Sequence, residues 1–222
     1  VAWGDYDNDG DLDLYVANSD DALLVVNAPN RLYINNGPAG FTDIAGSVGV
    51  NDPGNSRGVA WGDYDNDGYL DLYLANKNTN RLFRNDHSGG FTEVGDQFDV
   101  DDGRSGVSAA WGDFNKDGWL DLYVGNDNQP NRLYRNNITG SRWLSVRLVG
   151  AQSNRNGIGA RVVSVLGTTR QLRDVDGGSG YFSQPSLPVE FGFGTQAVVD
   201  SLIIQWPSGL RQVLNQVPTN QH

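Results

Sequence analysis

The sequence predicts an all-β fold: propeller-type repeats, three copies with the third partial, followed by a small β-sandwich or barrel-like domain. Two observations lead to this prediction. Almost the same run of eighteen residues begins at Val1, Val59 and Ala109, at intervals of 50 to 58 residues that are typical of propeller blades. Residues 142–217 contain no such repeat, but they alternate apolar and polar side chains in short runs separated by turn residues, as short strands do.

Each run contains a loop with oxygen-bearing side chains at positions 1, 3, 5 and 9 and a glycine at position 6. Calcium prefers six to eight oxygen ligands, and the glycine allows the sharp bend that brings them together. By analogy with the EF-hand loop, position 7 should add its backbone carbonyl, which leaves its side chain free to vary as Asp11, Tyr69 and Trp119 do. The expected ligands are Asp5, Asp7, Asp9, Asp11 and Asp13 in the first loop, Asp63, Asp65, Asp67, Tyr69 and Asp71 in the second, and Asp113, Asn115, Asp117, Trp119 and Asp121 in the third.

Three loops of constant spacing indicate about three calcium ions (Ca2+), one per loop. A single string of this kind would equally well be a polar turn, but here each copy lies between the same Trp-Gly and Leu-Asp-Leu-Tyr segments. The loops are not EF-hands, because position 12, where an EF-hand has glutamate, is Val16, Leu74 or Val124. The residues that follow alternate as in a strand, so the loops are expected to join strands. With Asn115 in place of aspartate and Lys116 beside it, the third loop should bind calcium most weakly.

Two further segments recur, one after all three loops and one after the first two. An Asn-Arg-Leu motif begins at Asn30, Asn80 and Asn131, and Gly-Phe-Thr at residues 40 and 90 opens another strand that the third repeat lacks. The first repeat also carries an insertion near residues 19–29, whose apolar core, Leu23–Val26, indicates an extra strand edge or a contact.

New material begins at Ser141, where we place a domain boundary. The repeats then occupy residues 1–141, and a second β domain occupies residues 142–222. Strands of the second domain are expected around residues 144–148, 162–166, 189–193 and 202–206, with turns at 154–157, 176–178 and 207–209.

Composition narrows the class of function. The chain has 27 acidic and 16 basic residues and a net charge of −11, which argues against binding nucleic acid or anionic membranes. Twelve aspartates lie in the three loops, so folding and calcium binding should be coupled. There is no cysteine and no apolar run long enough to span a membrane. Extracellular calcium would fill even weak loops, which favours an extracellular or cell-surface location, and a start at Val1 inside a repeat indicates processing or truncation.

The sequence does not indicate an enzyme. Its two histidines, His87 in a turn and His222 at the end of the chain, are expected to be solvated. Without cysteine or a positioned histidine, nucleophilic designs of the Ser-His-Asp and Cys-His types lack their parts. Paired carboxylates could serve a glycosidase, but the candidates lie in the loops that calcium would occupy.

Aromatic residues near the loops have two readings each. Trp3, Trp61 and Trp111 occupy one repeat position before the loops, which favours packing in the repeat core over stacking on sugars. Tyr69 and Trp119 are candidates for exposed ligand contacts, although simple variation at a loop position is the favoured interpretation.

The motifs resemble a known family. The three loops, written Asp-x-Asp-x-Asp-Gly-x-x-Asp with Asn115 as a variant, are similar to the FG-GAP or VCBS repeats of integrin α-chain propellers and many bacterial surface proteins. Residues 154–161, 175–181 and 199–209 resemble the ASPIC/UnbV domain, which commonly follows such repeats. The resemblance implies calcium binding in an extracellular or cell-envelope setting and no settled biochemical activity.

The number of repeats suggests association. A closed propeller has about four to eight blades, so three repeats leave exposed edges that favour pairing with other chains. Either the missing blades belong to a longer protein, or copies of this chain join head to tail into a ring or a filament. We therefore expect a non-enzymatic extracellular calcium-binding structural protein that associates with other copies. The alternative is an adhesion module that binds a protein or a glycan and was cut from a longer propeller protein.

Overall fold

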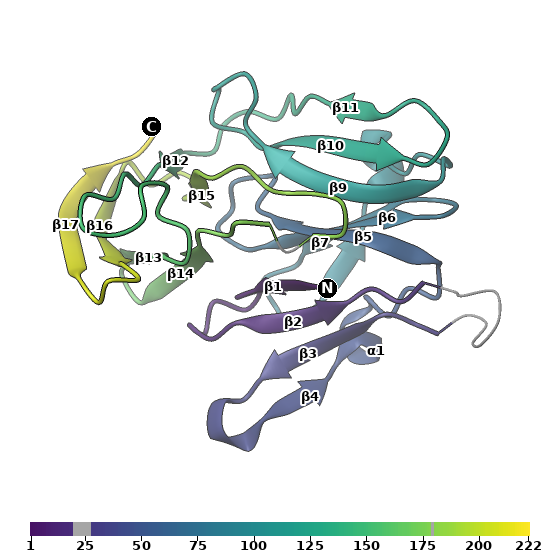
Figure 1. Cartoon of the computed structure of the whole chain (residues 1–222), viewed down its shortest axis with the longest axis horizontal. Coiled ribbons are helices and arrows are strands. Elements are labelled where there is room, and N and C mark those ends of the chain that lie inside the picture. The colour runs from purple at the N-terminus through teal and green to yellow at the C-terminus, as the bar shows by residue number, and fades with distance from the viewer. Residues whose placement is uncertain (20–27, 179) are drawn as a thin grey trace.

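The computed structural model describes residues 1–19, 28–178 and 180–222. The described residues form seventeen strands, one four-residue α-helix and two short 3₁₀ helices, so the prediction of an all-β fold is confirmed. Three small sheets are stacked face to face, and two further sheets lie along one side of this stack (Figure 1). The apolar insertion core predicted at Leu23–Val26 lies outside the described residues.

The three repeats form three blades, in which antiparallel strands follow one another in chain order. Blade 1 contains β1 (Ala2–Gly4), β2 (Asp13–Val16), β3 (Arg31–Asn35) and β4 (Phe41–Asp43). Blade 2 contains β5 (Ser56–Gly62), β6 (Asp71–Asn76), β7 (Arg81–Asn85) and β8 (Phe91–Glu93). Blade 3 contains only β9 (Gly106–Gly112), β10 (Asp121–Asn126) and β11 (Arg132–Tyr134). Helix α1 (Ala45–Val48) and the 3₁₀ helices Gly37–Ala39 and Gly95–Phe98 accompany the fourth strands.

Each predicted calcium loop joins the first two strands of its blade, as expected. The strand after the first loop alternates, with Asp13 and Tyr15 buried and Leu14 and Val16 half-buried. By contrast, every residue of β6 is buried, because blade 2 is covered by a neighbour on each face.

Blades stack through a tryptophan placed against a glycine. A Cβ atom at Gly4 would lie 2.9 Å from the indole of Trp61, and one at Gly62 would lie 2.6 Å from that of Trp111, so only glycine fits. The indole N–H of Trp111 also donates to the carbonyl of Ala60 at 3.3 Å. The expected core role is therefore confirmed for Trp61 and Trp111.

For Trp3 the core prediction is wrong. This side chain is 48% exposed, because the described chain has no blade on that side of β1. Its ring lies 6.2 Å, between centroids, from the exposed ring of Phe41 in the same blade.

The second domain consists of two sheets over one core. One sheet has the order β14-β13-β16-β17, and the other pairs β12 with β15. Buried side chains from both sheets, among them Leu144, Val162, Phe191 and Leu202, form a single apolar cluster, which is the arrangement of a small sandwich. Its strands are β12 (Trp143–Val146), β13 (Arg161–Leu166), β14 (Thr169–Asp174), β15 (Val189–Gly192), β16 (Val198–Gln205) and β17 (Arg211–Pro218).

Four of these strands were predicted, and β14 and β17 were not. Neither strand shows the apolar–polar alternation on which the prediction relied. Strand β14 reads Thr-Arg-Gln-Leu-Arg-Asp, and nearly every residue of β17 is exposed. The domain boundary near residue 141 stays a prediction. In the described residues, no helix is long and apolar enough to cross a membrane.

Candidate metal centre

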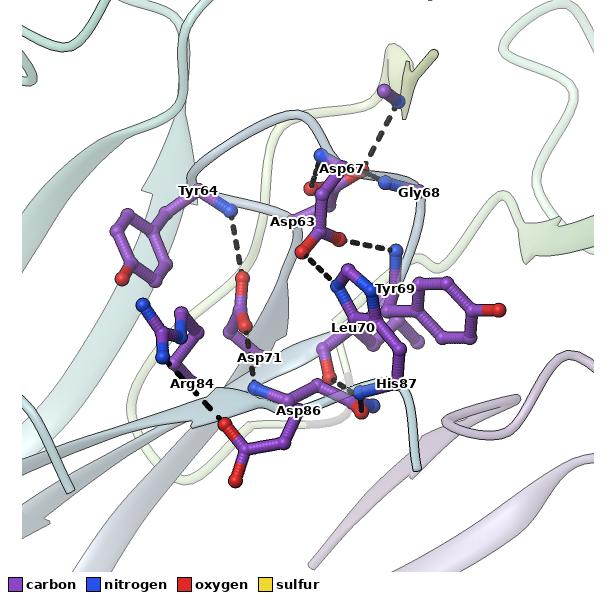
Figure 2. Close-up of polar contacts among 12 residues, drawn as sticks. Asp63, Tyr64, Asp67, Gly68, Tyr69, Leu70, Asp71, Arg84, Asp86 and His87 are labelled. Atoms are coloured by element: carbon purple, nitrogen blue, oxygen red, sulfur yellow. Dashed lines mark hydrogen bonds and ion pairs between the residues drawn. The ribbon is translucent and has the colours of Figure 1, made fainter. Parts of the chain in front are cut away.

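The middle loop brings three carboxylates together between β5 and β6. Oxygen atoms of Asp63, Asp65 and Asp71 all lie within 4.8 Å of one another. Asp63 and Asp71 are buried and Asp65 is half-buried. Figure 2 shows Asp63 and Asp71 on the inner side of the turn. Three converging carboxylates, two of them out of contact with water, form a donor set that suits a hard divalent cation.

Backbone amides hold the loop in this shape. Asp63 accepts from the amides of Asp67 and Gly68, both at 3.0 Å, and Asp67 accepts from the amide of Tyr69 at 2.9 Å. Gly68 has a φ of +99°, a conformation that a residue with a side chain rarely adopts. The sequence Asp-x-x-x-Asp-Gly thus encodes the bend itself as well as the ligands.

The last carboxylate of each loop fixes the loop to the third strand of its blade. Asp71 accepts from the amide of Tyr64 at 3.1 Å and from that of Asn85 at 2.9 Å. The same pair of bonds is made by Asp13 with Tyr6 and Asn35, and by Asp121 with Phe114 and Asn136.

These asparagines are functional residues that the sequence analysis missed. Each lies five positions after the first residue of the recurring Asn-Arg-Leu motif, and that recurrence was the signal that could have found them. The side-chain amide of Asn85 donates to the carbonyl of Tyr6 in the first loop at 2.9 Å, and that of Asn136 donates to Tyr64 in the middle loop at 2.7 Å. The first and middle loops are therefore each connected to the next blade.

Neighbouring loops are also joined directly. Asn8 donates to the carbonyl of Gly68 at 3.1 Å, and Asn66 donates to that of Gly118 at 3.0 Å. Asn8 and Asn66 have positive φ angles, which asparagine tolerates better than most residues. The third loop has Lys116 at this position, so the series of asparagine contacts stops there.

The first loop groups a different set of positions: Asp5, Asp7 and Asp9 at positions 1, 3 and 5, where the middle loop groups positions 1, 3 and 9 and leaves Asp67 outside. Asp5 is completely buried, and neither of its carboxylate oxygens has a hydrogen-bond partner among the described residues. A buried, unpartnered carboxylate is costly unless a cation balances it. Asp13 lies outside this group of three and is held by its two amide bonds instead.

The third loop forms no such group of acidic residues in the part of the chain that the structure describes. The side-chain amide of Asn115 donates to Asp117 at 2.7 Å, and Arg135 lies 3.9 Å from the same carboxylate. Asp113 accepts from the amides of Asp117 and Gly118. The loop keeps the backbone bend, but its Asp117 carboxylate is already in contact with protein side chains, those of Asn115 and Arg135.

Burial raises the pKa of the loop carboxylates. The pKa of Asp63 rises to about 8 and that of Asp5 to about 7, mainly because both groups are desolvated. Burial likewise raises the pKa of Asp65 to about 6, and that of Asp71 well above its usual range. Arg173 of β14 opposes the shift at Asp63 and Asp5. A divalent cation would do the same much more strongly.

Neither Trp119 nor Tyr69 is fully exposed, so the favoured interpretation, simple variation at a loop position, stays the prediction. Trp119 is only 6% exposed, so it is not a surface contact, and Tyr69 is half-buried, with its ring stacked on His87 at 4.5 Å. His87 lies in an exposed turn, as expected, with 49% of its side chain exposed, and its Nε2 atom contacts the carboxylate of Asp67, as Figure 2 shows. His222 contacts the carbonyl of Lys116 at 3.4 Å. The carbonyl roles expected of Asp11, Tyr69 and Trp119 stay predictions.

The middle loop is also where the second domain meets the blades. The backbone amide of Gly192 donates to Asp63 at 3.0 Å, and that of Gly194 donates to the carbonyl of Asn66 at 3.0 Å. A Cβ atom at Gly192 would lie 2.3 Å from the backbone of Asn66, so the close approach requires glycine. The side chain of Gln171 holds Gly192 from the other side, at 2.7 Å from its carbonyl.

Comparison with known families agrees with this architecture. The model of the FG-GAP-like repeat matches residues 5–74 and 63–124, which together make up more than half of the 222 residues. The chain belongs to the FG-GAP-like repeat family. The FG-GAP repeat model also matches residues 105–144, and the ASPIC and UnbV model matches residues 150–222. No curated protein sequence matches the chain.

In this FG-GAP-like protein, the matched repeats coincide with the three blades, and the ASPIC and UnbV match covers β13 to β17. Both resemblances inferred from the sequence are thereby confirmed. The acidic groups of the first two loops fall inside the FG-GAP-like match.

Proposed function

We propose that this FG-GAP-like protein is a non-enzymatic, calcium-scaffolded binding module of the cell surface or extracellular space. Ions in the first and middle loops neutralise the buried aspartates, fix the blades to one another and hold the second domain in place. The ordered blades then present surfaces to other chains, including further copies of this chain in a ring or filament.

The observation that carries the proposal is the environment of Asp63. This carboxylate is buried, lies beside Asp65 and Asp71, and accepts the Gly192 amide of the second domain. When calcium is bound, it supplies the positive charge that this group lacks, and the chain supplies the oxygens and the fixed bend. The same carboxylate then serves the ion and the domain contact.

Side-chain use supports a scaffold over a catalyst. The buried carboxylates of the loops accept from backbone amides, as Asp71 and Asp13 do on both oxygens, or face the grouped oxygens of their loop. A general acid and base pair needs a proton free to move at a substrate. Groups held by amides and by a metal ion are poorly suited to that role.

The two ends of the blade stack support association. At one end Trp3 and Phe41 are 48% and 51% exposed, and at the other Phe114 and Tyr123 are 56% and 45% exposed. Between blades 2 and 3 the equivalents of Phe114 and Tyr123, which are Tyr64 and Tyr73, pack on the tryptophan of the next blade. The open ends thus present the two halves of an interface that the chain already forms twice.

Isothermal titration calorimetry of the metal-depleted chain tests the proposal. We expect two calcium ions to bind, and Asp5→Asn and Asp63→Asn each to remove one, while the exposed control Asp96→Asn keeps both. Light scattering in millimolar calcium should give a mass above 24.1 kDa that returns to the monomer value on chelation. Absence of calcium binding at millimolar concentration would refute the proposal.

A further inference from the structure

Blade 3 ends at its third strand, and this leaves one edge of the blade unpaired. In blades 1 and 2 the chain turns back after the third strand and adds β4 or β8 antiparallel to it. In blade 3 the chain continues after Asn136 toward β12 in the second domain, so β11 is the edge of a three-stranded sheet. Figure 1 shows β11 at the outer border of the stack.

The fourth strand of blade 2 covers the aromatic contact between blades 1 and 2. Its Phe91 ring lies 5.8 Å from the ring of Tyr6 and 6.2 Å from that of Trp61, where it fills the outer part of the interface between blades 1 and 2. Tyr64 and Trp111 repeat this tyrosine–tryptophan pair between blades 2 and 3, with centroids 6.4 Å apart. No phenylalanine of a fourth strand covers this second pair in the described chain.

A hollow takes the place of that phenylalanine. Its volume is about 550 Å³, and its walls are mostly apolar and aromatic. Lining residues include Tyr64, Phe98, Trp111, Leu120, Tyr134 and Ile138. Phe98 at its rim is 43% exposed, although its ring also contacts that of Tyr64. The hollow has room for a phenyl ring and a surface that would favour one.

A basic side chain beside the hollow lacks a partner that its equivalent has. In blade 2, Arg81 pairs with Asp52 at 3.2 Å and with Glu93 of the fourth strand at 3.9 Å. In blade 3, Arg132 makes the first of these pairs, with Asp102 at 3.4 Å. No fourth-strand acid is present in the described chain to make the second.

We propose that the edge of blade 3 is a docking site for an extended segment of a polypeptide other than a further copy of this chain, bound by strand addition to β11. The register of blade 2 sets its chemistry, because Phe91 lies opposite Asn85 and Glu93 opposite Phe83. Transferred to blade 3, the segment places a phenylalanine opposite Asn136 and, two residues later, an acidic residue opposite Tyr134. Main-chain hydrogen bonds supply affinity, and the hollow and Arg132 supply selectivity.

A peptide copied from the chain's own fourth strand is the probe. The labelled hexapeptide Gly-Gly-Phe-Thr-Glu-Val, which repeats residues 89–94, is titrated with the full chain in millimolar calcium, and binding is followed by fluorescence anisotropy. We expect saturable binding. Replacing phenylalanine by alanine should weaken it about tenfold or more, since the ring's burial is lost. Proline in place of threonine should also weaken it, because the main chain then lacks a donor.

A paired substitution tests the charge contact. The peptide with glutamine for glutamate should bind the wild-type chain several-fold less tightly, and Arg132→Gln should remove this preference, while the exposed control Arg170→Gln keeps it. If Arg132→Gln does not fold, the peptide series on the wild-type chain still decides the matter. Equal affinity of the alanine and phenylalanine peptides, or no binding at millimolar peptide, would overturn the proposal. A chain whose hollow is filled by a second copy, seen as a dimer that excludes the peptide, would also overturn it.

Discussion

The backbone amide of Gly192 lies 3.0 Å from a carboxylate oxygen of Asp63, and this hydrogen bond joins two parts of the chain that are 129 positions apart. Asp63 belongs to the middle loop of the repeats, whereas Gly192 ends a strand of the second domain. Under the proposed function, loss of calcium would change the charge of this loop and with it the contact between the domains.

Substitution of Gly192 by alanine should test whether the domain contact and calcium binding at Asp63 are linked. The added Cβ would lie 2.3 Å from the backbone of Asn66, so one of the two segments must move. We expect a loss of about 1–3 kcal/mol of stability, typical of an overpacked site. Since coupling between two events is reciprocal, calcium affinity at the middle loop should fall as well. The control is Gly103→Ala, where an added Cβ meets nothing within 4 Å.

The variant Asp63→Asn should have opposite effects with and without calcium. In the metal-free chain at neutral pH it removes a buried carboxyl group, next to Asp65 and Asp71, that folding forces to take up a proton, so thermal stability should rise. In saturating calcium it should lose the ion's stabilisation, which at a hundred times the dissociation constant amounts to about 2.7 kcal/mol. Differential scanning calorimetry of the variant and the wild type, with and without calcium, measures both changes in thermal stability. A fall of stability in both would argue against a calcium site at this loop.

Stability of the metal-free chain should decrease as pH rises. Burial raises the pKa of Asp63 to about 8 and that of Asp5 to about 7, whereas an unfolded aspartate has a pKa of about 3.9. Between these values the folded state holds protons that the unfolded chain has released, so the free energy of unfolding falls with rising pH. Bound calcium replaces those protons and should flatten the slope between about pH 5 and pH 8. A metal-free melting temperature that increases over this range would contradict the assignment.

Asn115→Asp should create a stronger third site. The change adds a ligand charge and removes the amide that now occupies the carboxylate of Asp117 at 2.7 Å. We expect calorimetry to report a third ion, in addition to the two of the wild type. Asn137→Asp, an exposed change nearby, should leave the stoichiometry unaltered. If Asn115→Asp binds no more calcium than the wild type, Lys116 or the loop's backbone limits this site.

Asn85→Ala should cost more stability than the equivalent change at Asn136. The amide of Asn85 is buried and joins the carbonyls of Tyr6 and Leu70, whereas that of Asn136 is partly buried. Leaving those buried carbonyls without a donor costs about 1–3 kcal/mol. Urea titration of both variants gives the comparison, and equal losses would contradict a special role for the connection between blades 1 and 2.

The sequence allowed the repeats to be predicted more completely than their contacts. Aspartate spacing and the alternation after each loop gave the hairpins, and the missing Gly-Phe-Thr segment gave the short third blade. The hydrogen bonds by which Asn85 and Asn136 connect neighbouring blades, and the Gly192 contact, depend on which segments meet in space. A local sequence pattern does not contain that information. Trp119 and Trp3 show the same limit, since equivalent loop and strand positions become buried or exposed according to whether a neighbour covers them.

Hydrogen exchange at the amides of Gly192 and Gly194 tests the central claim most directly, because these amides donate to Asp63 and Asn66 of the middle loop. Mass spectrometry or nuclear magnetic resonance would follow them in millimolar calcium and after chelation, with the amides of β13 as an internal reference. The account predicts protection of both glycines in calcium and its loss on chelation while β13 stays protected. Equal protection of the two glycines under both conditions would contradict the coupling of calcium to the domain contact.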